Sequence, residues 1–195
     1  MLRVFFFVIP LLLLSGGTAL AGGEVGVDLL TGQPTLRLNV EKPLGQLWTV
    51  YGDLRVDSDR LQGRIQIGYH MHYPLADVAE FVLTPKVGAD YIRSFHDREQ
   101  AGDSQTATSG GYWTPSFGIR AELIPLGERW FALYAEANLA LPTGEISGEL
   151  EGTAGARLFN FGPLTGFIEY RGRLDLKTKN YEEAQIAGLD LSYNF

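Results

Sequence analysis

The sequence has no cysteine, no cluster of basic residues and no apolar run long enough to cross a membrane as a helix. Without cysteine there is neither a disulfide framework nor a cysteine that could carry a lipid anchor. The longest apolar run, from Val4 to Leu14, is about half of what a transmembrane helix needs. A helical membrane protein is therefore excluded. The 16 basic and 23 acidic residues give a net charge of −7, and such an acidic chain is a poor nucleic-acid binder.

The N-terminal segment has the features of a secretory signal peptide. Arg3 gives it a positive start, the apolar run follows, and Ala19-Leu20-Ala21 forms a small-residue cleavage site. We expect cleavage before Gly22. A chain of 195 residues suggests a single domain, so residues 1–21 are predicted to be the signal peptide and residues 22–195 the domain.

From Glu24 onward, apolar and polar residues alternate with a period of two, which indicates strands with two different faces. About ten such segments, most of roughly 9 to 13 residues, are long enough for tilted strands to cross a bilayer. The pattern predicts an all-β fold, a transmembrane antiparallel up-and-down β-barrel of about ten strands. An eight-stranded barrel that starts near Gln46 is the alternative. Pro85 and Pro115 remove ladder hydrogen bonds, so we expect an irregular rung at each.

The turns between these segments alternate in kind. Every second turn is short and contains Pro-Leu, at Pro43-Leu44, Pro74-Leu75, Pro125-Leu126 and Pro163-Leu164. The turns between them include the longer polar stretches 93–111 and 142–151. Short turns on one rim and longer loops on the other are typical of outer-membrane barrels, whose short turns face the periplasm.

The last strand carries a further signal. Ala187, Leu189, Leu191, Tyr193 and Phe195 alternate with small or polar residues. This segment resembles the closing strand of bacterial outer-membrane β-barrels, whose terminal aromatic residue is read by the barrel-assembly machinery. The resemblance implies an assembly signal at Tyr193 and Phe195, a Gram-negative outer-membrane location, and outer-membrane lipid and the assembly machinery as partners of a monomer.

The ends of the strands indicate which face meets lipid. Aromatic residues are expected near both rims of the apolar face, around an aliphatic middle with almost no charge, as lipid contact requires. The predicted aromatic girdle comprises Trp48, Tyr73, Tyr91, Trp113, Phe131 and Tyr193. Charges on the opposite face must then pair inside the barrel, because an unpaired buried ion costs several kcal/mol. The predicted lumenal ion-pair network comprises Arg55, Arg64, Arg120, Glu122, Glu136, Arg157, Glu169, Arg171, Arg173 and Asp190.

The histidines provide the only candidates for metal binding or catalysis. His70 and His72 share one face of a strand, but no complete ligand set accompanies them. They lie near the periplasmic rim, whereas omptin-type barrel proteases work at the extracellular rim. None of His70, His72 or His96 has the serine two residues later that a barrel-type lipid A deacylase uses. We therefore predict no catalytic residue, no metal site and no cofactor.

A second resemblance covers about forty residues. The stretch from Pro142 through Ala154-Gly155-Ala156-Arg157, followed by Gly162-Pro163-Leu164 and Glu169-Tyr170-Arg171, resembles hairpins of the YfaZ-like outer-membrane proteins. The resemblance implies a small Gram-negative barrel of uncharacterised role and supplies no catalytic residues.

The sequence thus predicts an outer-membrane barrel with a structural or surface-exposed role, without catalysis, whose lumen is filled by ion pairs. A narrow, porin-like pore for small solutes is one alternative. A barrel enzyme that acts on lipid A or peptides is the other.

Overall fold

The protein is all-β in the residues that the computed structural model describes, which are 20–56, 60–94, 111–126, 131–143, 148–161 and 163–194. None of these residues belongs to a helix that is long and apolar enough to cross a membrane. The described strands are β1 (Leu20–Asp28), β2 (Pro34–Pro43), β3 (Trp48–Val56), β4 (Arg60–Tyr69), β5 (Met71–Leu75), β6 (Ala79–Ser94), β7 (Tyr112–Pro125), β8 (Ala132–Ala140), β9 (Glu149–Phe161), β10 (Leu164–Asp175) and β11 (Tyr181–Asn194).

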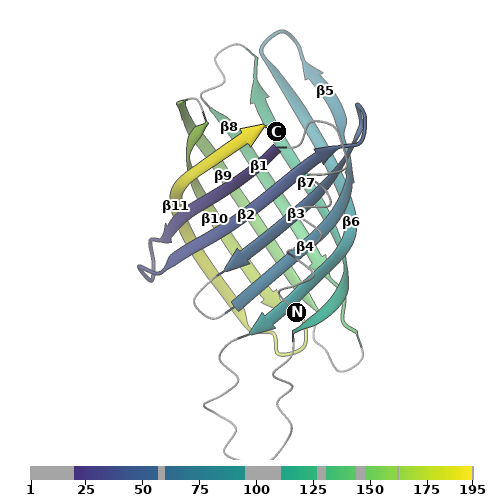
Figure 1. The fold of residues 1–195 in the computed structure, drawn as a ribbon, viewed down its shortest axis with the longest axis vertical. Coiled ribbons are helices and arrows are strands. Elements are labelled where there is room, and N and C mark those ends of the chain that lie inside the picture. Colours follow the sequence, from purple (N-terminus) through teal and green to yellow (C-terminus); the bar gives the residue numbers. More distant parts are fainter. Residues whose placement is uncertain are drawn as a thin grey trace, which may run out of the picture.

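The strands close into one antiparallel barrel (Figure 1). Strands that are neighbours in sequence pair with each other, except β4 and β5. The first strand pairs with the last, and β4 closes the ring by pairing with β6. Strands β4 and β5 lie end to end along β6, separated only by His70, so they occupy one position in the ring. The barrel therefore has ten strands, as predicted. The eight-stranded alternative is wrong, because β1 and β2 lie in the ring between β11 and β3.

The two prolines keep the ladder between β6 and β7, where Pro85 pairs with Ile119 and Pro115 with Ala89 in one continuous register. On the other side of β6 the ladder is interrupted at Pro85. Pairing with β4 ends at Lys86 and pairing with β5 begins at Leu83, so the irregular rung expected at Pro85 is confirmed. Pro115 lies just outside the β7–β8 pairing, which begins at Ser116. A register shift also lies between β9 and β10, at Gly166 and Phe167.

The two ends of the barrel differ. The connections 44–47, 76–78, 126–131 and 162–163 lie at the end where β11 finishes, which we call the short-turn end. The connections 29–33, 57–59, 95–111, 141–148 and 176–180 lie at the opposite end, the loop end. Phe195 and most of the expected signal peptide lie outside the described residues. Leu20 and Ala21 begin β1, and cleavage before Gly22 remains a prediction.

The two faces of the barrel wall have different chemistry. The outward face exposes large apolar side chains around the ring, among them Val25 on β1, Ile67 on β4, Phe117 on β7, Ile168 on β10 and Leu189 on β11. The alternation also places three charged residues of the described strands on the outward side: Arg93 and Glu183, which are exposed, and Lys42, which is buried. Each lies within three residues of a strand end. The middle of the outward surface is thus an apolar band, which is the face that a lipid-embedded barrel needs.

Glycine is required where β6 meets β4. Gly88 pairs with Gln66, and a Cβ atom added to it would lie 1.9 Å from the carbonyl oxygen of Ile65 and 2.7 Å from the Cα of Gln66. Because both neighbours are backbone atoms, neither can rotate away. The close approach of these two strands therefore depends on the missing side chain.

We expect Gly88→Ala to destabilise the barrel by about 1–3 kcal/mol, the usual range for overpacking. Urea unfolding in lipid vesicles measures this loss. Gly152→Ala on β9 is the matched control, since nothing lies within 4 Å of the added Cβ. Alanine in a strand is better than glycine by about 0.5–1 kcal/mol, so the control should be neutral or slightly stabilising. Equal effects of the two substitutions would contradict the conclusion that the close approach of β4 and β6 depends on Gly88.

Candidate functional site

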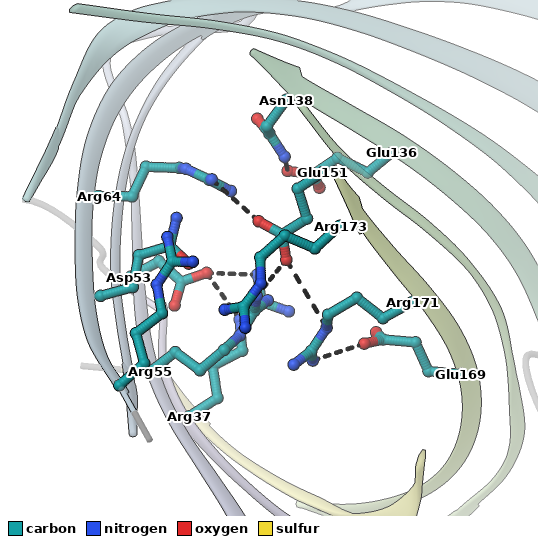
Figure 2. Close-up of polar contacts among 12 residues, drawn as sticks. Arg37, Asp53, Arg55, Arg64, Glu136, Asn138, Glu151, Glu169, Arg171 and Arg173 are labelled. Carbon is teal, nitrogen blue, oxygen red and sulfur yellow. Dashed lines mark hydrogen bonds and ion pairs between the residues drawn. The ribbon is translucent and has the colours of Figure 1, made fainter. Parts of the chain in front are cut away.

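The candidate site is the charged interior of the barrel, and Glu151 on β9 is its centre. The Glu151 carboxylate contacts the guanidinium groups of Arg55 on β3, Arg64 on β4 at 3.1 Å and Arg171 on β10 at 3.6 Å. Figure 2 shows these arginines converging on it from different strands. Only 3% of the Glu151 side chain is exposed. One carboxylate thus holds three cations inside the lumen.

The contact between Glu151 and Arg55 crosses the barrel. In the ring order, four strand positions separate β9 from β3 in either direction. The two residues therefore extend from opposite walls and meet inside the lumen. A second ion pair spans the lumen closer to the loop end. In it, Arg60 on β4 lies 2.6 Å from Glu149 on β9.

Further carboxylates hold the arginines around Glu151. Arg64 contacts Asp90 at 2.8 Å, and the Asp90 side chain is fully buried. Arg37 contacts Asp53 at 2.6 Å and Glu24 at 3.4 Å. Near the β9–β10 wall, Arg171 contacts Glu169 at 2.7 Å. Arg64 and Arg171 thus each have a second carboxylate on their own or a neighbouring strand, whereas the ion pair of Arg55 is the one with Glu151 across the lumen.

The half of the lumen towards the short-turn end holds a second cluster. Lys86 contacts Glu136 at 3.0 Å, and Arg120 contacts Glu122 at 2.7 Å. Arg157 reaches the same Glu122 at 3.5 Å. The cationic groups also lie over aromatic rings: Lys86 lies 4.7 Å from the Tyr51 ring, and Arg120 and Arg157 lie 5.8 and 5.6 Å from that of Tyr134. These contacts follow the wall. Arg120 also reaches across the lumen to Glu41 on β2, at 4.0 Å.

The residues predicted for the network fall into these groups. Arg55, Arg64 and Arg171 meet at Glu151, Glu169 supports Arg171, and Arg120, Glu122, Glu136 and Arg157 form the second cluster. Arg173 pairs with Glu182 near the loop end. Asp190 is buried and borders the central cavity.

The sequence analysis missed the central residue. Glu151 was assigned to the polar loop 142–151, but β9 already begins at Glu149. The alternation Glu149, Glu151, Thr153 against Leu150, Gly152, Ala154 could have identified it. Arg60 and Glu149 were likewise assigned to turns. The alternation places Glu24, Arg37, Asp53, Lys86 and Asp90 on the lumenal face, although they were not among the residues predicted for the network.

The histidines contact other polar side chains. His70 lies 3.0 Å from the Thr84 hydroxyl and 2.9 Å from that of Thr49. His72 lies 2.8 Å from a Glu80 oxygen. The part of the chain that the structure describes contains no group of three residues that could hold a metal ion. His96 lies outside the described residues.

The predicted girdle residues lie at the strand ends. Trp48 packs edge-on against Tyr69 at 4.9 Å, and Tyr73 lies 6.1 Å from Phe81, both towards the short-turn end. Tyr91 lies 5.4 Å from Trp113 at the loop end. Phe131 precedes β8 and is half-buried. Tyr193 belongs to β11, but its side chain lies outside what the structure describes.

A small cavity of about 50 Å³ remains between the charged side chains. One water molecule needs about 10–15 Å³ on this measure, so the cavity has room for only a few. The charged lining residues are six acidic and six basic ones: Glu24, Glu41, Asp53, Glu136, Glu151 and Asp190, with Arg37, Arg55, Arg64, Lys86, Arg120 and Arg157. The cavity is thus polar and balanced in charge.

Comparison with known proteins gives little further guidance. No family model matches the chain, so the resemblance to the YfaZ-like family gains no support there. No curated protein matches either.

Three solved structures with similar folds are distant in sequence. The N-terminal β-barrel domain of Pseudomonas aeruginosa OprF is 9% identical, with a TM-score of 0.40 over 91% of this chain and 97% of that one. The NanC porin is 11% identical, with a TM-score of 0.43 over 88% and 98%. The translocator domain of the autotransporter NalP from Neisseria meningitidis is 12% identical, with a TM-score of 0.34 over 97% and 93%. At these TM-scores the likeness carries no argument about role.

Proposed function

We propose that the protein is a monomeric outer-membrane β-barrel of a Gram-negative bacterium, with a structural or surface-exposed role and a lumen closed by ion pairs. The apolar band around the outward face supports the membrane location. The difference between the two ends supports the orientation, with the short-turn end in the periplasm and the loop end outside. In this proposal the barrel-assembly machinery inserts the chain by reading Tyr193 and Phe195.

The contact between Arg55 and Glu151 is the observation that carries the closed lumen. It joins opposite walls, and Arg64 and Arg171 hold the same carboxylate from two other strands. A solute that passed through would have to separate these buried charges. Breaking a buried pair costs about 3–5 kcal/mol. We therefore expect the contact of Glu151 with Arg55, which we call the Glu151 bridge, to stay closed.

The purified wild-type protein should be silent in planar bilayers while it shows heat-modifiable migration on gels. The heat-modifiable shift reports a folded barrel, so silence cannot be attributed to unfolded protein. Regular conductance steps from folded protein would refute the closed lumen.

A narrow pore is the second candidate, and the cavity of about 50 Å³ favours it. A chain of water between the charges could conduct small ions if the bridge were mobile. The same bilayer recording separates the two proposals. No observation favours the barrel enzyme, since the described histidines contact threonine, tyrosine and glutamate side chains in ordinary polar pairs.

A further inference from the structure

The ion pairs change in character along the barrel axis. Towards the loop end they cross the lumen and are buried, as Glu151 with Arg55 and Glu149 with Arg60. Towards the short-turn end most of them follow the wall, and the one that crosses, Arg120 with Glu41, is loose at 4.0 Å. The side chains there are also more exposed to water. The side chain of Arg157 is 39% exposed there and that of Glu41 is 34% exposed. The lumen is therefore more tightly closed at one end than at the other.

The cavity lies between the Glu151 bridge and the short-turn end of the barrel. Glu151, Arg55 and Arg64 border it at its inner limit. Glu41 near the end of β2 and Arg157 near the end of β9 border it towards the short-turn end. Arg60 and Glu149, which begin β4 and β9 at the loop end, do not belong to its lining. The cavity thus extends from the bridge towards the short turns.

We propose that this cavity is a dead end that is entered from the periplasm, is shut towards the cell exterior by the Glu151 bridge, and binds small polar solutes without net charge. The six acidic and six basic lining residues leave no net attraction for an ion of either sign. They offer many hydrogen-bonding groups to a neutral or zwitterionic molecule. The small volume limits the occupant to water and to solutes of a few heavy atoms. The periplasmic side of this inference rests on the orientation proposed above.

The absence of native cysteine allows a direct test with introduced thiols. Thr153 borders the cavity two residues after Glu151 on β9, on the side of the short-turn end. A Thr153→Cys variant therefore reports access to the inner end of the cavity. A small neutral methanethiosulfonate should modify this thiol in the folded barrel in nanodiscs. A second substitution, Glu41→Cys at the cavity mouth, then receives a bulky polymer maleimide before the small reagent is added.

The polymer at position 41 should abolish modification of the Thr153→Cys thiol. The same polymer on a Thr31→Cys variant, at the loop end, is the matched control and should leave modification unchanged. Adding Glu151→Ala should restore modification behind the blocked mouth, because it opens the second entrance. His72→Cys, with a half-exposed side chain on the same rim, replaces Glu41→Cys if that variant shows no heat-modifiable migration.

Two results overturn the inference. One is a Thr153→Cys thiol that never reacts in folded protein, and the other is a thiol that the loop-end polymer protects and the short-turn polymer does not. Failure of the proposed orientation gives a different result. In intact cells the polymer should then react with the Glu41→Cys variant and not with the Thr31→Cys variant, while the dead-end geometry in nanodiscs stays the same.

Discussion

Replacing Glu151 by alanine is expected to give single-channel conductance and to lower the stability of the barrel. The substitution removes the carboxylate that faces Arg55, Arg64 and Arg171. Three guanidinium groups then repel one another where their shared partner stood. Loss of one partner of a buried pair costs about 3–5 kcal/mol. Planar-bilayer recording measures the conductance, and urea unfolding in vesicles measures the loss of stability.

Glu182→Ala is the matched control for this experiment. Glu182 also pairs with an arginine, Arg173, but its side chain is 58% exposed near the loop end. Exposed pairs contribute about 0–1 kcal/mol, so the control should remain silent and nearly as stable as the wild type. A Glu151→Ala protein that stays silent and fully stable would show that the bridge does not close the lumen.

An arginine in the middle of the outward face should destabilise the barrel strongly. Ile119 lies at the centre of β7, is exposed and pairs with Ala137 of β8. In a bilayer, arginine at mid-depth costs about 2–4 kcal/mol, while near the interface it costs about 0–1 kcal/mol. Ile119→Arg is therefore expected to lower the unfolding free energy in vesicles by the larger amount.

Leu150→Arg provides the comparison at another depth. Leu150 is also outward and exposed, but it is the second residue of β9, close to the loop end. The loss should be several-fold smaller there. If both substitutions are equally harmless, the outward face contacts water and the membrane account fails.

Much of the architecture follows from local pattern. The period-two alternation predicts the strands, their faces and the ring of ten, because lipid outside and ion pairs inside impose opposite chemistry on successive residues. The short Pro-Leu turns correctly predict which strand ends share a rim. The alternation does not show the break at His70, since it continues from β4 into β5, but the irregular rung expected at Pro85 lies opposite this break.

The pairing of charges could not be predicted. Which lumenal residues meet depends on the stagger of strands around the ring, and alternation says nothing about stagger. Arg55 and Glu151 are 96 residues apart in the chain and meet only because β3 and β9 face each other. Apolar lumenal residues were also missed: Phe167 and Ile186 are buried on the side of the wall that carries Glu169 and Asp190. Alternation with Glu169 and Asp190 places both residues on the lumenal face, but it does not predict that apolar side chains pack among the ion pairs.

The central claim is that the apolar outward face contacts lipid, while the charged residues of the inward face pair with one another inside the lumen. Tryptophan fluorescence tests it most directly, with Trp48 and Trp130 replaced by phenylalanine so that outward-facing Trp113 alone remains. In vesicles whose lipids carry bromine on their acyl chains, the account predicts strong quenching of Trp113 and little quenching by aqueous iodide. Fluorescence that iodide quenches and bromolipids leave unchanged would contradict it.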